Sequence, residues 1–471
     1  MRLLFIIGVL TFYATINSEA NSVSLKDERR KESQQFVVDL ARNFSSFYFQ
    51  VSAVFSVPER IVSPLSIFIP MSMLAYGARG RTKDTYLKAI GLPKSKTSLA
   101  KVGYEIFLDN LAKYDVQMKT KIFVPSDFEV KSGFEKTTKK VFKVEYEKVP
   151  VTDGFMDSGK INEWVAAQTH NNVTKLFESQ RIGPDPNMVL VNTVYFKGTW
   201  QKAFNKSLTE LRPFHPLNSE RSVDVPTMYT EGRFRYGRMD GFNASFIELP
   251  YKSNSENETM SMFIILPDDK KWDDWKWLVY ELRNMNLNKL LNSTEKDVKL
   301  YLPKFKIEIN QSLTRIIDRI LNPDLSKIEN HVDSAPSVAA LRARQAAELE
   351  RFIGFPSPRQ KRGAKADRPK PARFSGFFKH PKPMKLGETA TKIVIEVGEE
   401  GQETAESSGI SYNAFEASSD RKTRSANLEL IEFKVDRPFI AIVALKGRIL
   451  TDIFSINFNG FTFIPEDATF W

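Results

Sequence analysis

Few side chains in this sequence could act as catalysts. The 471 residues include no cysteine, which excludes a thiol nucleophile and a cysteine-held metal or redox centre. The histidines show no metal-ligand spacing, and the chain has no phosphate-binding glycine loop and no nucleophile elbow. A serine triad assembled in space by the fold is the arrangement that the sequence leaves open, and we expect no enzyme activity. The four histidines are His170, His215, His331 and His380.

Some peptide bonds are well suited to attack by another enzyme. Arg424-Ser425 lies in the basic stretch 421–425, and trypsin-like proteases hold arginine with a carboxylate in their specificity pocket. Arg421 and Arg424 also match a minimal furin-type pattern. Upstream, the run Arg359-Gln360-Lys361-Arg362 matches a proprotein-convertase site. In both places the alternative is a solvated basic stretch that no protease uses.

The first twenty residues predict secretion. Arg2 precedes an apolar run from Leu3 to Leu10, and Ser18-Glu19-Ala20 forms a small-x-small cleavage site, which is typical of a signal peptide cut after Ala20. The apolar run is too short for a membrane span, and no later stretch is long and apolar enough. We therefore expect a soluble extracellular protein that comprises residues 21–471 and has no membrane partner.

Seven Asn-x-Ser/Thr sequons agree with that compartment. A secreted chain without disulfides must be held together by its core, which favours one large domain. Because sequons also arise by chance, we expect glycan at about half of them. The candidates are Asn43, Asn172, Asn205, Asn243, Asn257, Asn292 and Asn310.

The excess of positive charge belongs to one segment. Between Val338 and Lys385 there are thirteen basic and three acidic residues, so that this segment carries 13 − 3 = +10 of the formal +11. The Pro-rich basic stretch within it cannot bury enough apolar surface to order itself. We predict a basic, partly disordered insert at about 330–384. Arg359, Lys361 and Arg362 could bind a sulfated polysaccharide or another polyanion, could mark a cleavage site, or could belong to a tolerated surface insertion. Secretion argues against a nucleic-acid partner.

The remaining elements are several helices and runs of consecutive strands, which predicts an α+β domain. Ile61–Ile67 reads as a short strand that enters a helix, with Ser63 as its N-cap and Pro64 at the first helical position. Residues rich in β-branched and aromatic side chains predict further strands. These are 115–124, 188–196, 246–249, 260–266, 298–309, 391–397 and several within 428–463, with helices at 36–55 and 313–321.

Several ordered blocks resemble one family. The chain is similar to the serpins, the serine protease inhibitor superfamily, over residues 30–465. The resemblance lies in the blocks IVSPLSI, LVNTVYFKGTWQKAF, FIELPYKS, MSMFIILPDD, LPKFKIE and VDRPFIAIV.

The resemblance implies three β-sheets, about eight to nine helices and an exposed reactive-centre loop, here at about 399–430. It identifies Glu399-Glu400-Gly401 as the hinge of that loop. After a target protease cuts the loop, the loop enters the large sheet as an extra strand and drags the acyl-enzyme with it. The implied partner is a serine protease, and the implied state is a monomer without a cofactor.

Other positions are carried over from the family as structural sites. Ser63, Ser66 and Asn192 match polar positions of the shutter, where the main sheet opens. Trp200 matches the tryptophan of the breach, the point where the loop first enters. By count from Gly401, Thr391 stands where the family has a shutter histidine, which changes the hydrogen bonding beneath the sheet.

The loop departs from the inhibitory pattern at the face that turns inward on insertion. Gln402, Thr404 and Glu406 replace the usual small residues, and a buried unpaired carboxylate such as Glu406 is costly. The usual spacing places the scissile bond at Phe415-Glu416, whereas Arg424-Ser425 is the chemically attractive bond. A displaced bond leaves slack in the tether and favours cleavage as a substrate.

Two functions therefore stay open. The first is a secreted inhibitor that traps a trypsin-like serine protease covalently, which the hinge glycine and Arg424-Ser425 favour. The second is a non-inhibitory serpin that acts as a binding or carrier protein or as a cleavable precursor, which Gln402, Glu406 and Thr391 favour.

Overall fold

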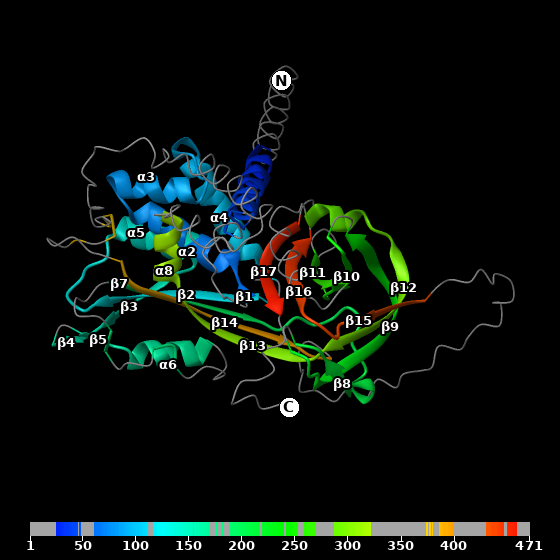
Figure 1. The fold of residues 1–471 in the computed structure, drawn as a ribbon. Helices are drawn as coiled ribbons and strands as arrows, with labels where there is room; N and C mark the ends of the chain where they lie inside the picture. Colours follow the sequence, from blue (N-terminus) through cyan, green and yellow to red (C-terminus); the bar gives the residue numbers. More distant parts are fainter. Residues whose placement is uncertain are drawn as a thin grey trace, which may run out of the picture.

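The computed structural model describes a helical layer, a five-stranded sheet and a larger sheet beside them (Figure 1). The residues described are 25–45, 47–48, 61–111, 113, 116–153, 155–168, 175–177, 181–182, 188–216, 219–239, 242–252, 259–268, 287–321, 374, 376–377, 379, 386–399, 430–446 and 450–458.

The five-stranded sheet has the order β13-β14-β7-β2-β3. Its strands are β13 (Phe305–Ser312), β14 (Leu386–Val397), β7 (Met188–Phe196), β2 (Val116–Pro125) and β3 (Glu145–Val149). β14 and β7 run parallel at its centre, whereas β13 and β2 flank them in antiparallel pairs. Alternate residues of each strand face opposite sides, so β14 sends Ile393 and Ile395 into the main core and Val394 into a smaller cluster.

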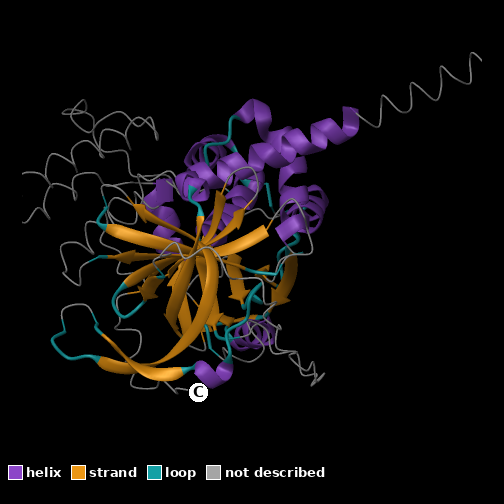
Figure 2. Cartoon of the chain, turned by 90° about the vertical axis from the view of Figure 1, so that its right-hand side faces the viewer, coloured by secondary structure: helices purple, strands orange, loops and turns teal. Residues whose placement is uncertain are grey.

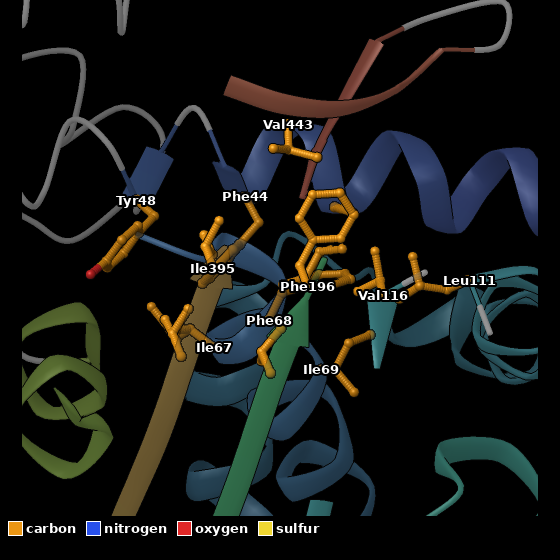
Figure 3. Packing of buried hydrophobic residues seen from close by; sticks show 14 of the residues in the cluster. Phe44, Tyr48, Ile67, Phe68, Ile69, Leu111, Val116, Phe196, Ile395 and Val443 are labelled. Atoms are coloured by element: carbon orange, nitrogen blue, oxygen red, sulfur yellow. The ribbon is translucent and has the colours of Figure 1, made fainter. Parts of the chain in front are cut away.

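Helices cover both faces of this sheet (Figure 1). The main core lies between the sheet and α2 (Pro64–Gly77), where Phe68 of α2 approaches Phe196 of β7 and Ile395 of β14 (Figure 3). On the other face, α6 (Gly159–Gln168) packs Ile161 and Val165 against the sheet. Most of the helices lie together on one side of the strands (Figure 2). They are the helix at 25–45, α2, α3 (Gly80–Ala89), α4 (Thr97–Leu111), α5 (Ser132–Thr137) and α8 (Leu313–Leu321).

The larger sheet contains nine strands in the order β1-β17-β16-β11-β10-β9-β12-β15, with β8 paired to β9. The strands are β1 (Ile61–Val62), β17 (Leu450–Phe458), β16 (Phe439–Lys446), β11 (Thr259–Pro267), β10 (Ala244–Pro250), β9 (Val223–Met239), β12 (Glu295–Pro303), β15 (Ile431–Lys434) and β8 (Glu210–Phe214). A third, small sheet contains β4 (Val151–Thr152), β5 (Phe155–Asp157) and β6 (Arg181–Ile182). These three sheets and the helices confirm the predicted α+β class and the expected number of sheets.

One strand prediction is wrong. Residues 298–309 were expected to form a single strand, but the chain forms β12 up to Pro303 and begins β13 at Phe305. The two strands belong to different sheets, and Lys304 between them donates its backbone N–H to the carbonyl of Pro226 at 2.8 Å. The sequence does carry a sign of the break. The buried residues shift from Val298, Leu300 and Leu302 to Phe305 and Ile307, so the alternation changes phase. Pro303, which cannot donate to a strand ladder, stands at the same point.

The end of the predicted insert at 330–384 needs a correction. Phe374 and Phe377 are fully buried in the main core, where their rings lie 5.9 Å from Tyr86 and 3.8 Å from Phe134. A Cβ added at Gly77 would lie 1.9 Å from the ring of Phe377, so the helix and this segment fit only with a glycine there. Phe374 and Phe377 thus belong to the folded domain. Arg359, Lys361 and Arg362 lie outside the described residues.

Candidate functional site at the β14–β7 seam

The boundary between β14 and β7, which we call the seam, is the one parallel pairing in the centre of the five-stranded sheet. Thr391 lies opposite Asn192, and Ile395 lies opposite Phe196. The segment that follows β14 can turn back only antiparallel to β14, and it would then be antiparallel to β7 as well. A strand placed in the seam would therefore replace one parallel pairing by two antiparallel pairings. This change should stabilise the sheet, because antiparallel ladders are slightly more stable than parallel ones.

A cluster of neutral polar side chains lies beneath the middle of the seam. Asn192 is fully buried; its Nδ2 donates to the carbonyl of Ser66 at 3.3 Å, and its Oδ1 accepts from Thr120 Oγ1 at 3.0 Å. Thr391 is fully buried as well, and its Oγ1 lies 3.5 Å from Asn192 Nδ2, at the outer limit of a hydrogen bond. Asn192 therefore connects three strands and a helix.

The start of α2 places Ser66 in this cluster. Ser63 caps the helix, and its Oγ accepts from the backbone N–H of Ser66 at 3.3 Å, with Pro64 at the first helical position. The Ser66 hydroxyl donates back to the carbonyl of Ser63 at 2.7 Å. The predicted cap is confirmed. Sequence reasoning missed Thr120, which is the register partner of Asn192 in the β2–β7 pair.

The end of the seam at the carboxyl end of β14, which we call its top, is held by Trp200. Its indole Nε1 donates to the carbonyl of Gly398, just after β14, at 2.8 Å. The indole is only 2% exposed and stacks on Tyr251 with ring centroids 4.3 Å apart. Trp200, which follows β7 in the chain, thus fixes the end of β14.

Glu399 is the first residue of the predicted loop at 399–430, and it is anchored on three sides. Its carboxylate accepts from Lys304 Nζ at 2.9 Å and from Thr209 Oγ1 at 3.0 Å, while its carbonyl accepts from the backbone N–H of Phe204 at 2.9 Å. Burial raises the pKa of this carboxyl, but the hydrogen bonds from Lys304 and Thr209 outweigh that effect and lower the pKa below its ordinary value. The hinge acid is therefore a charged anchor.

Ion pairs also cross the sheet on the side opposite the main core. Lys197, which follows β7, lies 3.3 Å from Glu396 of β14, so this pair bridges the seam. Lys306 of β13 lies 3.8 Å from the same carboxylate. Lys392 of β14 is only 7% exposed and pairs with Glu308 at 3.2 Å. Sequence reasoning missed these pairs because neighbours across a sheet depend on register.

The remaining predicted residues divide between exposed positions and positions outside the described part. Asn43, Asn205, Asn243, Asn292 and Asn310 are exposed, which an acceptor for glycan requires. The following predicted residues lie outside the described part: the signal peptide 1–20, Asn172, Asn257, Glu400, Gly401, Gln402, Glu406, Phe415, Glu416, Arg424 and Ser425.

The described part of the chain lacks a membrane-spanning helix and a metal cluster. No helix there is both long and apolar enough to cross a membrane. Among the same residues, no group of three or more His, Asp or Glu side chains is arranged to hold a metal ion.

Comparison with known proteins gives one family throughout. The family model described as "Serpin (serine protease inhibitor)" matches residues 39–324, which is more than half of the chain. Antitrypsin of Bombyx mori is 27% identical over 407 residues, covering 84% of this chain and 88% of its own. Antichymotrypsin-2 of the same species is 30% identical over 278 residues, covering 58% and 70%.

Solved structures show the same fold. Serpin48 of the insect Tenebrio molitor matches with a TM-score of 0.62 at 22% identity, over 90% of this chain and 98% of its own. Protease nexin-1 with heparin matches with a TM-score of 0.63 at 23% identity, over 90% and 99%. Thyroxine-binding globulin with thyroxine matches with a TM-score of 0.63 at 20% identity, over 90% and 98%. Together with the family model, the ordered sheets and the seam show that this chain belongs to the serpin family.

Proposed function

We propose that this serpin is a secreted inhibitor that traps a trypsin-like serine protease. The family model and the curated relatives support serine protease inhibition in general. The signal peptide at 1–20 and the sequons support an extracellular glycoprotein. The relatives' names include both an antitrypsin and an antichymotrypsin, so the specificity rests on Arg424-Ser425.

The observation that carries the proposal is the parallel seam with the loop attached directly to one of its strands. A protease serine attacks the carbonyl of Arg424, the Arg424–Ser425 peptide bond breaks, and an ester joins the two proteins while Ser425 becomes a new amino terminus. The freed segment then enters the seam beginning at Gly401. Trp200 and Lys304 release the end of β14 as this happens.

The length of the loop sets how well such a trap works. β14 contains 12 residues, and a strand of equal length that begins at Gln402 ends at Asn413. Cleavage at Arg424 then leaves the 11 residues 414–424 as tether, which span up to roughly 36 Å when extended. Cleavage at Phe415 leaves only two. A slack tether distorts the captured protease less, so we propose that part of the Arg424 reaction ends in release of cleaved serpin.

The test is to mix the mature protein with trypsin and, separately, with chymotrypsin, and to run denaturing gels. We expect a band at the summed mass with trypsin, together with a cleaved product. Sequencing the released peptide should give Ser425 as its first residue. The matched variants are Arg424→Gln, which should remove the trypsin complex, and Phe415→Ala, which should leave it. Cleavage at Arg424 with no such band would contradict the trapping proposal.

A second function is favoured by the composition of the hinge. Gln402 and Glu406 belong to the face that turns inward, and an inserted Glu406 would have to be protonated or paired. The alternative is therefore a non-inhibitory carrier or a cleavable precursor, and thyroxine-binding globulin is a carrier with the same fold. Such a protein would be cut by trypsin without gaining thermal stability.

The basic insert supports a separate binding proposal. Arg359, Lys361 and Arg362 lie in a segment with a formal charge of +10, which favours sulfated polysaccharide or another polyanion. Protease nexin-1, which has the same fold, was solved with heparin. Retention on a heparin column that Arg359→Gln, Lys361→Gln and Arg362→Gln together shift to lower salt would support this role. Unchanged elution would exclude it.

A further inference from the structure

A row of three charged side chains crosses the five-stranded sheet near the top of the seam. The row contains Lys306 of β13, Glu396 of β14 and Lys197, which directly follows β7. Lys197 Nζ lies 3.3 Å from Glu396 Oε2, and Lys306 Nζ lies 3.8 Å from Glu396 Oε1. One carboxylate is therefore held by a cation across the seam and by a second cation on its own side of the seam.

Strand register places these side chains in one row. Lys306 is the Cα partner of Glu396 in the β13–β14 pair. Ile395 pairs with Phe196, so the next step along both strands brings Lys197 beside Glu396. Ile395 and Phe196 both point into the main core. Because successive residues of a strand face opposite sides, the row lies on the other face of the sheet.

The two lysines are closely matched in burial. The side chains of Lys197 and Lys306 are 28% and 29% exposed, and that of Glu396 is 21% exposed. Lys306 also lies 3.1 Å from Glu308 of its own strand. Partly buried charges are screened less than charges on the open surface, so both pairs should contribute measurably at low salt. What chiefly distinguishes the lysines is their position relative to the seam.

Insertion of a strand into the seam affects the two pairs differently. Neighbouring strands lie about 4.8 Å apart, so an inserted strand moves β7 away from β14 by about that distance again. The contact of 3.3 Å between Lys197 and Glu396 is then lost, because a new backbone lies between their strands. No strand enters between β13 and β14, so the contact between Lys306 and Glu396 is kept.

We propose that Lys197 is a positioning residue for the insertion step, since its ion pair with Glu396 holds the top of the seam closed and must break before the strands separate. The inference rests on the proposed inhibitory function, in which insertion competes with hydrolysis of the ester at Arg424. An ion pair that slows insertion lowers the fraction of protease that is trapped. Glu396 keeps Lys306 as a partner when the seam opens, so the cost of opening falls on the Lys197 contact.

The test measures how fast a separate peptide enters the seam of the uncleaved mature chain, so that no protease takes part. The peptide has the sequence of residues 402–413 with Glu403→Gln and Glu406→Gln, and its ends are acetylated and amidated. It carries no charge, so the loss of a lysine does not change its attraction to the protein. Native mass spectrometry follows the fraction of protein that holds one peptide, at about 0.01 M and about 1 M salt.

Four proteins are compared, namely the original chain, Lys197→Gln, Lys197→Arg and Lys306→Gln, and the thermal midpoint checks that each one folds. At low salt, Lys197→Gln should take up the peptide about threefold faster than the original chain. Lys197→Arg keeps the charge and should behave like the original chain. Lys306→Gln removes the matched cation on the other side of Glu396 and should not accelerate uptake. At high salt the difference between Lys197→Gln and the original chain should largely disappear.

The same variants apply to the reaction with trypsin. Faster insertion leaves less time for hydrolysis of the ester, so Lys197→Gln should raise the ratio of covalent complex to cleaved serpin about threefold at low salt. Lys306→Gln should leave this ratio unchanged. If Lys197→Gln does not fold, Lys197→Met takes its place, because it keeps the apolar stem of the side chain.

Equal uptake by Lys197→Gln and the original chain at low salt would overturn the proposal. Equal acceleration in Lys306→Gln would overturn it too, because the charge across the seam would then have no separate role, and so would the absence of uptake by all four proteins. The inhibitory function is judged separately. A chain that shows the expected uptake but forms no covalent complex with trypsin keeps the role of Lys197 in closing the seam and loses the inhibitor proposal.

Discussion

The middle and the top of the seam are held by different chemistry. In the middle, Asn192 joins Thr120, Ser66 and Thr391 through neutral hydrogen bonds between fully or nearly fully buried groups. At the top, Glu399 is held by the charge of Lys304, whose side chain is 35% exposed. Neutral buried bonds respond little to pH or salt, whereas a partly exposed ion pair responds to both. The two regions should therefore respond differently to pH and salt.

The largest expected effect on stability comes from breaking the hydrogen bonds of Asn192 in the middle of the seam. Asn192→Ala removes the group that connects β2, β7 and α2 and leaves several buried partners unsatisfied. We expect the free energy of unfolding of the uncleaved protein to fall by about 3 kcal/mol. Urea unfolding followed by far-ultraviolet circular dichroism measures it. A loss below about 1 kcal/mol would show that the cluster is not the main tie of the seam.

The second largest effect on stability is expected at Glu399, at the top of the seam. Glu399→Gln removes the charge that Lys304 and Thr209 hold, and we expect a loss of about 2 kcal/mol, since hydrogen bonds to charged groups are the stronger kind. The loop should also become more sensitive to proteolysis. The control is Glu396→Gln, whose ion pairs with Lys197 and Lys306 involve side chains that are 21% to 29% exposed, so its loss should be smaller.

The pH dependence separates the two regions. The pKa of Glu399 is lowered in the folded protein, so its contribution is fully present above the pKa of an unfolded glutamate and is lost as the pH falls through the lowered value. The stability difference between the original chain and Glu399→Gln should therefore shrink as the pH falls from 6 to 3. The difference for Asn192→Ala should change much less over this range. Parallel shifts in both variants would contradict the distinction.

Trp200→Phe tests the uncharged hydrogen bond at the top of the seam, from the indole to the carbonyl of Gly398. The change keeps a ring against Tyr251 but removes the donor to Gly398, and we expect a loss of about 1 kcal/mol. Hydrogen exchange of the β14 amides measures the local effect. Faster exchange confined to the last residues of β14 is the expected result, and uniform acceleration over the sheet would contradict it.

The smallest effect is expected at Thr391. Thr391→Val keeps the shape of the side chain and removes only a hydrogen bond of 3.5 Å, so the free energy of unfolding should change by less than about 1 kcal/mol. Urea unfolding beside Asn192→Ala measures it. A loss as large as that of Asn192→Ala would mean that Thr391 carries the role that we assign to Asn192.

The sequence predicted the elements better than the contacts. Ser63, Pro64 and strand 188–196 were predicted correctly because capping and β-branched composition are local signals. The break at Lys304 was missed although the alternation of buried residues changes phase between Leu302 and Phe305, beside Pro303. Phe374 and Phe377 were assigned to an insert because their surroundings are basic and rich in proline, although long-range packing buries both.

The sequence named residues along the seam but not the side chains that they contact. Asn192, Trp200 and Glu399 were named from family blocks, and the structure shows what each one contacts. Thr120, Thr209 and Lys304 were missed because their contacts depend on strand register and on distant segments that meet in space. A carboxylate at the end of a core strand was a usable signal, since such a group needs a cation or several donors.

The most direct test of the account is the thermal midpoint before and after cleavage of the loop by trypsin at Arg424. Insertion of the freed segment into the β14–β7 seam should raise the midpoint by about 10 °C or more, because a new strand adds two antiparallel ladders. An unchanged or lower midpoint after complete cleavage at that bond would contradict insertion at the seam and would leave the carrier or precursor function in its place.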